Sequence, residues 1–252
     1  MDKNATNESE FKIAHGYTIN DLWYPRVTSI VSIKAKPALY RFYGELNSFA
    51  EGEAIKQKSA DEGTLIHETV EKILTGKEVS VDSSIEPSIT AAIKFIKERN
   101  IQVDSDWVEK RIINFHERYT GTIDALALID GKFGVLDIKT SQEIYRDYDL
   151  QTAAYFGAIS DVVDNLQTRW ILRIDQIQKC LKCGARRRLK GGRDKIRKGL
   201  SPLCSDHEWS EMEGVTELKE FPHWQHDYEA FLGAKKLWEW ENLGWLKKVG
   251  YL

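Results

Sequence analysis

The chain is poor in cysteine: it has three among 252 residues, too few for a disulfide framework. It also lacks any apolar run long enough to span a bilayer, so we expect no membrane association. The polar start MDKNATNESE lacks the basic-then-apolar order of a secretory signal. These absences predict an intracellular protein whose cysteines bind a metal rather than form disulfides.

A strong charge of either sign is also missing, because the net charge is −3 and the isoelectric point is near 6.1. Any affinity for nucleic acid must therefore come from a local patch. The hydrophobic content of 42% and charged content of 30% are ordinary for a globular protein with a sizeable core. We expect a disordered tail over residues 1–14, a core over 15–178, a cysteine-containing module over 179–208 and a helical segment over 209–252.

Hydrophobic periodicity and Gly/Pro punctuation predict a mixed α/β core without internal repeats. The expected helices cover residues 38–49, 53–76 with a cap at Gly76, a stretch that begins at Pro87, and 149–162. The expected strands cover 107–115, two arms of a hairpin within 119–140, and 168–174. A closing amphipathic helix is expected near the C-terminal end.

The hairpin within residues 119–140 is predicted from Asp130-Gly131, a dipeptide that favours the positive φ angles of a two-residue loop. With that loop, Ile129 pairs with Lys132, and counting back places Asp124 opposite Asp137. Side chains alternate along a strand, so both aspartates share one face with Lys139. The opposite face is apolar and holds Ile123, Ala125, Leu136 and Ile138.

Two like charges placed opposite each other destabilise a sheet, so this arrangement favours a cation bound between Asp124 and Asp137. Two carboxylates followed by a lysine are the groups needed to bind a hard divalent metal and to activate water. The register is an inference, since a three-residue loop would send the two aspartates to opposite faces. The aspartates are also consistent with solvated positions on an open sheet face.

Two predicted helices carry polar pairs at four-residue spacing, which places each pair on one helical face. His67 and Glu71 form the first pair, and Gln151 and Tyr155 form the second. Each pair has a structural alternative. His67 fits the edge of a core, Glu71 fits solvent, and the second helix packs on a sheet through its alanines and Tyr155.

Four short motifs follow one another along the chain: GTLIH at 63–67, GTID at 121–124, DIK at 137–139 and QTAAY at 151–155. In this order and spacing they resemble the RecB-like branch of the PD-(D/E)XK nuclease superfamily. The segment YPRVTSIV at 24–31 is similar to one that often opens phage and mitochondrial exonucleases of this kind. The resemblance covers roughly residues 22–174.

The resemblance implies a restriction-endonuclease-like mixed sheet with the element order αβββαβ, flanked by helices. It also implies that Asp124 and Asp137 hold Mg²⁺ or Mn²⁺, with the backbone carbonyl of Ile138 completing the protein ligands. His67 resembles the extra metal ligand of the family, which suits manganese because imidazole is the softer ligand.

The same resemblance implies roles for four further residues. Lys139 would orient or deprotonate the attacking water and offset charge on the phosphate. Gln151 and Tyr155 would position the lysine, the metal waters or the DNA backbone. Glu71 is a weaker candidate, because its role varies among relatives.

The cysteines form a second pattern, Cys180-x-x-Cys183 followed by Cys204-x-x-His207, which uses all three thiols of the chain. A CxxC pair with a CxxH pair supplies the four ligands of a structural zinc site. The alternative is three unrelated reduced thiols and a surface histidine. An iron–sulfur cluster, which several RecB-like nucleases carry, uses four cysteines, one of them before the nuclease core. His223 and His226 are alternative fourth ligands.

The segment between the cysteine pairs is strongly basic, with one acidic residue, Asp194. Such a patch on a net acidic protein is suited to phosphate contacts, although a charge run is often just a solvated loop. Its basic residues are Arg186, Arg187, Arg188, Lys190, Arg193, Lys195, Arg197 and Lys198.

Two function classes follow. The first is a divalent-metal-dependent DNA nuclease, with an exonuclease that needs a free DNA end favoured over a structure-specific endonuclease. The second is a non-catalytic nucleic-acid-binding protein on a nuclease-derived fold. The complete set of Asp124, Asp137 and Lys139 favours the first, with roles in DNA processing, recombination or repair. Its expected location is the cytoplasm, or the host cytoplasm if it is phage-encoded.

Overall fold

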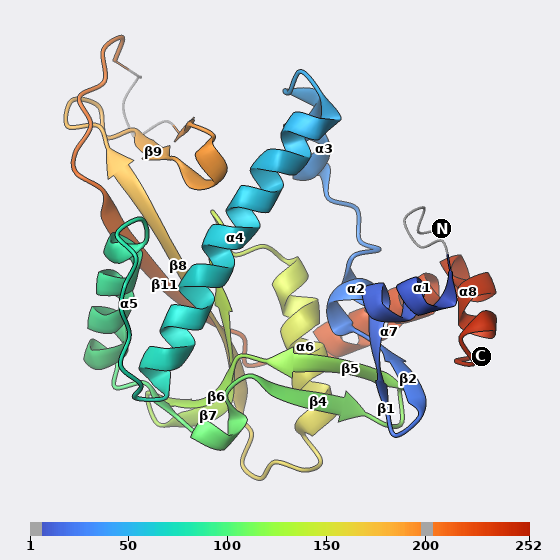
Figure 1. The fold of residues 1–252 in the computed structure, drawn as a ribbon. Coiled ribbons are helices and arrows are strands. Elements are labelled where there is room, and N and C mark those ends of the chain that lie inside the picture. Colours follow the sequence, from blue (N-terminus) through green and yellow to red (C-terminus); the bar gives the residue numbers. More distant parts are fainter. Residues whose placement is uncertain (1–6, 198–203) are drawn as a thin grey trace.

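A computed structural model describes residues 7–197 and 204–252 of the chain (Figure 1). The helices are, in chain order, α1 (Glu8–His15), α2 (Val27–Val31), α3 (Pro37–Gly44), α4 (Phe49–Leu74), α5 (Glu86–Glu98), α6 (Asp147–Ile159), α7 (Gln225–Glu241) and α8 (Leu243–Lys248), with short 3-10 helices η1 (Ser105–Trp107) and η2 (Lys190–Gly192). Among these described helices, none combines the length and apolar character needed to cross a membrane.

Seven strands form one mixed sheet in the order β10-β9-β8-β7-β6-β3, with β11 also paired to β8. Only the pairing of β7 with β8 is parallel, whereas the others are antiparallel. Two smaller two-stranded sheets pair β1 with β2 and β4 with β5. The strands are β1 (Gly16–Ile19), β2 (Leu22–Pro25), β3 (Gln102–Val103), β4 (Lys110–Asn114), β5 (Tyr119–Ile123), β6 (Ala125–Ile129), β7 (Lys132–Lys139), β8 (Thr168–Lys179), β9 (Arg186–Arg188), β10 (Lys195–Arg197) and β11 (Glu213–Glu220).

The chain is therefore a mixed α/β protein whose sheet is flanked by helices, as the sequence predicts. Two hydrophobic cores hold these layers together. One lies between the sheet and helices α4 and α5, and it includes Ile66 and Ile89. The other joins α2, α6 and α7 to strands β5, β6 and β7, and it includes Phe156 and Trp238.

The predicted hairpin register is confirmed from Ile129↔Lys132 through Ala125↔Leu136. The backbone then bends at Asp124, and β5 leaves β7 to pair with β4. Ile123 consequently packs in the α6 core, whereas Ala125 packs in the α4 core. The prediction that Ile123 shares a face with Ala125 is wrong, because the strand does not continue straight through Asp124.

Helix boundaries follow their local capping chemistry. Ser48 caps α4, since its side chain accepts a hydrogen bond from the Glu51 amide at 3.1 Å. This cap begins a new helix at Phe49, so the single helix expected over 38–49 is wrong at its C-terminal end. Gly76, at φ +70°, follows Thr75, the C-cap residue of α4, and Pro87 lies in the first turn of α5, as predicted.

The structure departs from the sequence predictions near both ends of the chain. The expected disordered tail is wrong for residues 8–14, which belong to α1 and include Phe11, fully buried against the core. Residues 1–6 lie outside the described residues. The expected helical segment over 209–252 contains strand β11, which pairs with β8 along its whole length. Strand β8 itself runs to Lys179, beyond the predicted end at residue 174.

Candidate catalytic and metal-binding sites

His67 lies on α4 directly beside the bend at Asp124. Its Nε2 atom is 3.0 Å from Oδ2 of Asp124. Gly63, one turn earlier, permits this approach, because a Cβ there would lie 2.7 Å from Oγ1 of Thr140. The helix thus packs close to the end of β7 and brings an imidazole to the aspartate, as the sequence predicts.

Asp137 and Lys139 extend from β7 at the same place. Asp137 is fully buried, and its Oδ2 lies 2.5 Å from Nζ of Lys139. Between them, Ile138 donates its backbone N–H to Oδ2 of Asp124 at 2.5 Å, which holds the two aspartates together. The role of the Ile138 carbonyl as a metal ligand stays a prediction.

Helix α6 adds the predicted glutamine and tyrosine. The side-chain amide of Gln151 lies 3.3 Å from Oδ1 of Asp137 and donates to the Tyr155 hydroxyl at 2.8 Å. The ring of Tyr155 is buried against β5, where Gly121 leaves it room. A Cβ on Gly121 would lie 2.5 Å from this ring. The structure therefore brings all the predicted catalytic residues together around Asp137.

Glu109, which the sequence analysis missed, joins the same cluster. It precedes β4 with a φ of +50°, and its amide bonds to the Asp124 carbonyl at 3.0 Å. Its Oε1 lies 3.3 Å from Nδ1 of His67, and His67, Glu109 and Asp124 place one potential ligand atom each within 4.8 Å of the others. No motif or spacing marks this residue, because it meets His67 only through the fold.

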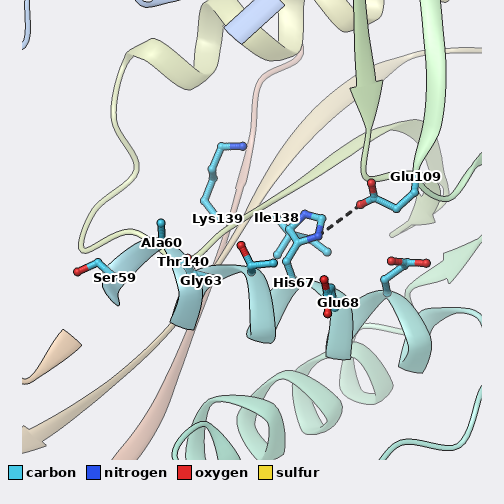
Figure 2. A pocket seen from close by; sticks show the side chains of 11 residues that line it. Ser59, Ala60, Gly63, His67, Glu68, Glu109, Ile138, Lys139 and Thr140 are labelled. Atoms are coloured by element: carbon cyan, nitrogen blue, oxygen red, sulfur yellow. Dashed lines mark ion pairs between the residues drawn. The ribbon is translucent and has the colours of Figure 1, made fainter. Parts of the chain in front are cut away.

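His67, Glu109 and Lys139 line an open cleft of about 520 Å³ between α4 and the end of β7. Figure 2 shows His67 and Glu109 pointing toward each other across it, with Lys139 alongside. Glu71 and Glu68, on the same helix, also line the cleft. Glu71 therefore lies at the site. In the described structure, however, it makes no direct contact with Asp124 or Asp137, so it is not one of the central groups.

The electrostatics of the cluster show a shortage of positive charge. Burial and the charge of Asp124 raise the pKa of Glu109 to about 7. Burial also raises the pKa of Asp137 to about 6, with Asp124 adding to the effect and Lys139 opposing it. Burial lowers the pKa of His67, but the hydrogen bond and charge of Asp124 outweigh it and raise the value to about 9.

The protonated imidazole therefore serves as a counter-ion where three acidic groups meet. A divalent cation would replace this proton and neutralise the carboxylates at the same time. Oxygen donors with one imidazole are a donor set that fits Mg²⁺ or Mn²⁺. The residues present thus fit the metal that the sequence implies.

The cysteine pairs converge at the far end of β8. The Cys204 sulfur lies 3.6 Å from that of Cys180 and 3.5 Å from that of Cys183. The Nδ1 atom of His207 lies 3.2 Å from the Cys204 sulfur and 3.6 Å from the Cys183 sulfur. In a tetrahedral zinc site with Zn–S bonds of about 2.3 Å, ligand sulfurs lie about 3.8 Å apart. The cluster is compatible with a structural zinc ion.

A tight turn makes this convergence local. The Gly184 amide bonds to the Cys180 carbonyl at 2.9 Å, and the Cys180 amide bonds to the Ala185 carbonyl at 2.8 Å. Cys180 also forms an isolated bridge with Trp209. His223 and His226 lie elsewhere: the His223 carbonyl accepts from Arg169, and the ring of His226 lies 3.9 Å from Glu229. The structure therefore selects His207.

The basic segment is folded onto the protein rather than free. Residues 186–188 and 195–197 pair as strands β9 and β10. Three guanidinium groups are matched by acids: Arg187 pairs with Asp194, Arg193 with Glu45, and Arg197 with Glu143. Of the eight predicted DNA-binding residues, Lys198 lies outside the described residues.

Two more members of the segment bind the end of β7. Arg188 donates to both carboxylate oxygens of the buried Asp175 at 2.8 and 2.7 Å, and to the Thr140 carbonyl at 2.9 Å. Lys190 donates to the same carbonyl at 2.6 Å. Arg186 and Lys195 are exposed and form no ion pair among the described residues, although Glu45 interacts electrostatically with Lys195. The exposed positive charge is smaller than the sequence indicates.

No protein-family model matches the chain, and no curated protein matches it significantly. The function is therefore argued from the geometry of the two sites.

Proposed function

We propose that this protein is a divalent-metal-dependent DNA nuclease, and specifically an exonuclease. One observation carries the proposal: His67 of α4, Asp124 at the bend before β6, and Asp137 and Lys139 of β7 lie together, with Nε2 of His67 3.0 Å from Asp124 and Nζ of Lys139 2.5 Å from Asp137. Binding alone needs no buried aspartate pair with a lysine, whereas phosphodiester hydrolysis uses each of these groups.

The metal ligands in this proposal are Asp124, Asp137 and His67, with the Ile138 carbonyl as a further donor. Glu109 lies within reach of the same ion, because its carboxylate shares His67 with Asp124. A bound Mg²⁺ or Mn²⁺ would polarise the scissile phosphate and favour formation of hydroxide from water. The cleft beside α4 leaves room for a phosphate to reach these ligands.

Lys139 is the proposed partner of the attacking water and of the phosphate charge. Burial lowers the pKa of Lys139, but the charges of Asp137 and Asp124 outweigh it and raise the value, so the ammonium is the favoured form. A fixed cation there stabilises negative charge that grows on the phosphate in the transition state. Gln151 holds Asp137 by its amide, and Tyr155 holds Gln151, so this pair orients the carboxylate.

The order of elements supports a restriction-endonuclease-like core. Helix α4, strands β5, β6 and β7, helix α6 and strand β8 occur in the order αβββαβ that the resemblance implies, with α5, β3, η1 and β4 between α4 and β5. Within this unit, Asp124 lies at the bend between β5 and β6, and Asp137 pairs with Ile171 in the parallel β7–β8 ladder.

The module over residues 179–208 is proposed to hold one zinc ion with no part in the chemical step. Four protein ligands close a tetrahedral site and leave no open position for water. Its basic residues then divide into two groups. Arg188 and Lys190 attach the module to the end of β7, whereas Arg186 and Lys195 are the members available for DNA phosphates.

The test of this proposal is digestion of end-labelled linear DNA and closed circular DNA with Mg²⁺ or Mn²⁺. An exonuclease shortens the linear substrate and leaves the circle intact, whereas an endonuclease cuts both. Asp137→Asn serves as the inactive control, because it keeps the shape of the side chain but removes its charge. Binding of DNA without cleavage of either substrate would instead support the non-catalytic alternative.

A further inference from the structure

A second cavity, of about 710 Å³, adjoins the catalytic residues on the side of α6. Its walls come from α2, α3 and the segment that joins them, from the residues before and in α6, and from Lys195 of β10. Tyr148 and Gln151 line it, and each also contacts the site. The Lys139 ammonium is 5.1 Å from the centre of the Tyr148 ring, and Gln151 reaches Asp137. We call this cavity the α6 groove.

The α6 groove is positively charged on a protein that is negative as a whole. Its lining has four basic residues, Lys34, Lys36, Arg146 and Lys195, and one acid, Asp147, which pairs with Lys34. Within residues 7–197 and 204–252 the other three form no ion pair, although Glu45 interacts electrostatically with Lys195, and Asp149 with Arg146. Partial burial and the guanidinium groups of Arg197 and Arg193 lower the pKa of Lys195, as expected where positive charges are crowded. Phosphates would relieve this repulsion.

Aromatic rings stand between these charges. Tyr145 and Tyr148 meet edge to face with ring centres 5.8 Å apart, and Tyr145 is 38% exposed. Phe42 also lines the groove, and its ring is held by the guanidinium of Arg193, 5.1 Å from the ring centre, and by the ring of Tyr43. Rings fixed in this way can stack on flat partners without losing much side-chain entropy.

Basic groups interleaved with aromatic rings are typical of sites for single-stranded nucleic acid. Unpaired bases present their faces for stacking, whereas the bases of a duplex stack only on each other. An acidic peptide would satisfy the charges but would leave the rings without flat partners. The first cleft, by contrast, is lined by Glu68, Glu71 and Glu109 and repels phosphates unless a cation is bound.

We propose that the α6 groove binds a single strand of DNA, with bases on Tyr145, Tyr148 and Phe42 and phosphates beside Lys36, Arg146 and Lys195. The strand would pass Tyr148 and Gln151 to reach Asp137 and Lys139. The idea that the groove delivers the strand for cleavage rests on the proposed nuclease function. The idea that the groove binds single-stranded DNA does not. The substrate class that follows is a single strand or a duplex with an unpaired end.

The test measures binding to the full-length Asp137→Asn protein by fluorescence anisotropy, with a labelled single strand and a blunt duplex of the same sequence. We expect tighter binding of the single strand. Tyr145→Ala should weaken it about 5- to 100-fold, the range for losing one base–aromatic stack, whereas Tyr145→Phe should retain it. Replacing Lys36, Arg146 and Lys195 with glutamine should reduce the slope of log affinity against log salt by about 2.

Matched controls are Trp240→Ala and Lys236→Gln, both exposed on α7 and outside the groove. Equal or tighter binding of the duplex, or a Tyr145→Ala variant that binds as well as its parent, would overturn the proposal. The two ideas fail separately. If the wild-type protein cleaves DNA and Tyr145→Ala has no effect on binding, only the proposed groove is wrong. If binding depends on the groove but no DNA is cleaved, only the proposed nuclease function is wrong.

Discussion

Two clusters of potential metal ligands differ in almost every physical respect. The carboxylate site (His67, Glu109, Asp124 and Asp137) uses hard oxygen donors, opens into a cleft and contains a lysine. The cysteine site (Cys180, Cys183, Cys204 and His207) uses soft sulfur donors and is packed against Ala185 and Trp209. Open oxygen-rich sites leave room for water and substrate, whereas closed thiolate sites hold the fold. The difference indicates one site for chemistry and one for architecture.

The strongest test of this division between a chemical and a structural site is to remove the central groups of the carboxylate site. Asp124→Ala, Asp137→Ala and Lys139→Ala should each reduce DNA cleavage by at least about 10²- to 10³-fold, because each group acts on charge that develops in the transition state. Circular dichroism should show the same fold. Glu98→Gln, exposed on α5, is the control that should cleave normally. Normal turnover by any of the three variants would remove the catalytic assignment.

The cysteine site should respond in stability rather than in chemistry. We expect Cys183→Ser to lose the bound zinc and to lower the free energy of unfolding by at least about 3 kcal/mol, because structural zinc supplies folding energy directly. Thermal unfolding and elemental analysis of protein purified without chelator measure both quantities. Leu181→Ser, at an exposed neighbouring position, should change neither. Iron, or no metal, in the wild-type protein would contradict the zinc assignment.

A third prediction concerns the proton that His67 holds when no divalent metal has been added. Its pKa is raised from 6.5 to about 9, so its contribution to stability is fully present below pH 6.5 and is lost as pH rises through 9. The loss should reach about 3 kcal/mol, measured as a fall in the midpoint of chemical denaturation. His67→Gln should abolish this part of the pH dependence, and His226→Gln should keep it. Equal slopes in His67→Gln and wild type would contradict the ion pair.

The smallest effect we expect is in metal preference. His67→Ala should reduce cleavage about tenfold and shift the preference from Mn²⁺ toward Mg²⁺, because an imidazole ligand favours the softer ion. Rates measured across concentrations of both metals give this ratio directly. An unchanged ratio would return His67 to a purely structural position at the edge of α4.

The sequence predicted the parts of the carboxylate site that depend on local spacing. His67, Asp124, Asp137 and Lys139 follow from a helix, a hairpin turn and strand alternation. The bend at Asp124 was missed, because it depends on a side-chain hydrogen bond. The Ile138 amide donates to the carboxylate of Asp124 instead of to a backbone carbonyl. Glu109 was missed for a related reason, since its contact with His67 exists only once β4 and α4 are packed.

Strand β11 shows a different limit of sequence patterns. Its segment alternates weakly, and most of its side chains are half buried or charged, such as Glu217 and Lys219. Such a pattern does not distinguish an edge strand from a polar loop or helix. The pairing partner decides the conformation here, because β11 forms only by adding to β8. The cysteine site was easier to predict, since CxxC and CxxH bring their ligands together almost locally.

The attachment of the cysteine module has a consequence for modularity. The chain enters the module after Lys179 and returns beside it, where the Ser210 amide bonds to the Lys179 carbonyl at 2.9 Å. A short turn at that point would close the β8–β11 ribbon without the module. The buried Asp175 would then lose Arg188 and keep only Arg173, 3.5 Å away. Any related chain without the module should therefore carry a different residue at this position or another cation beside it.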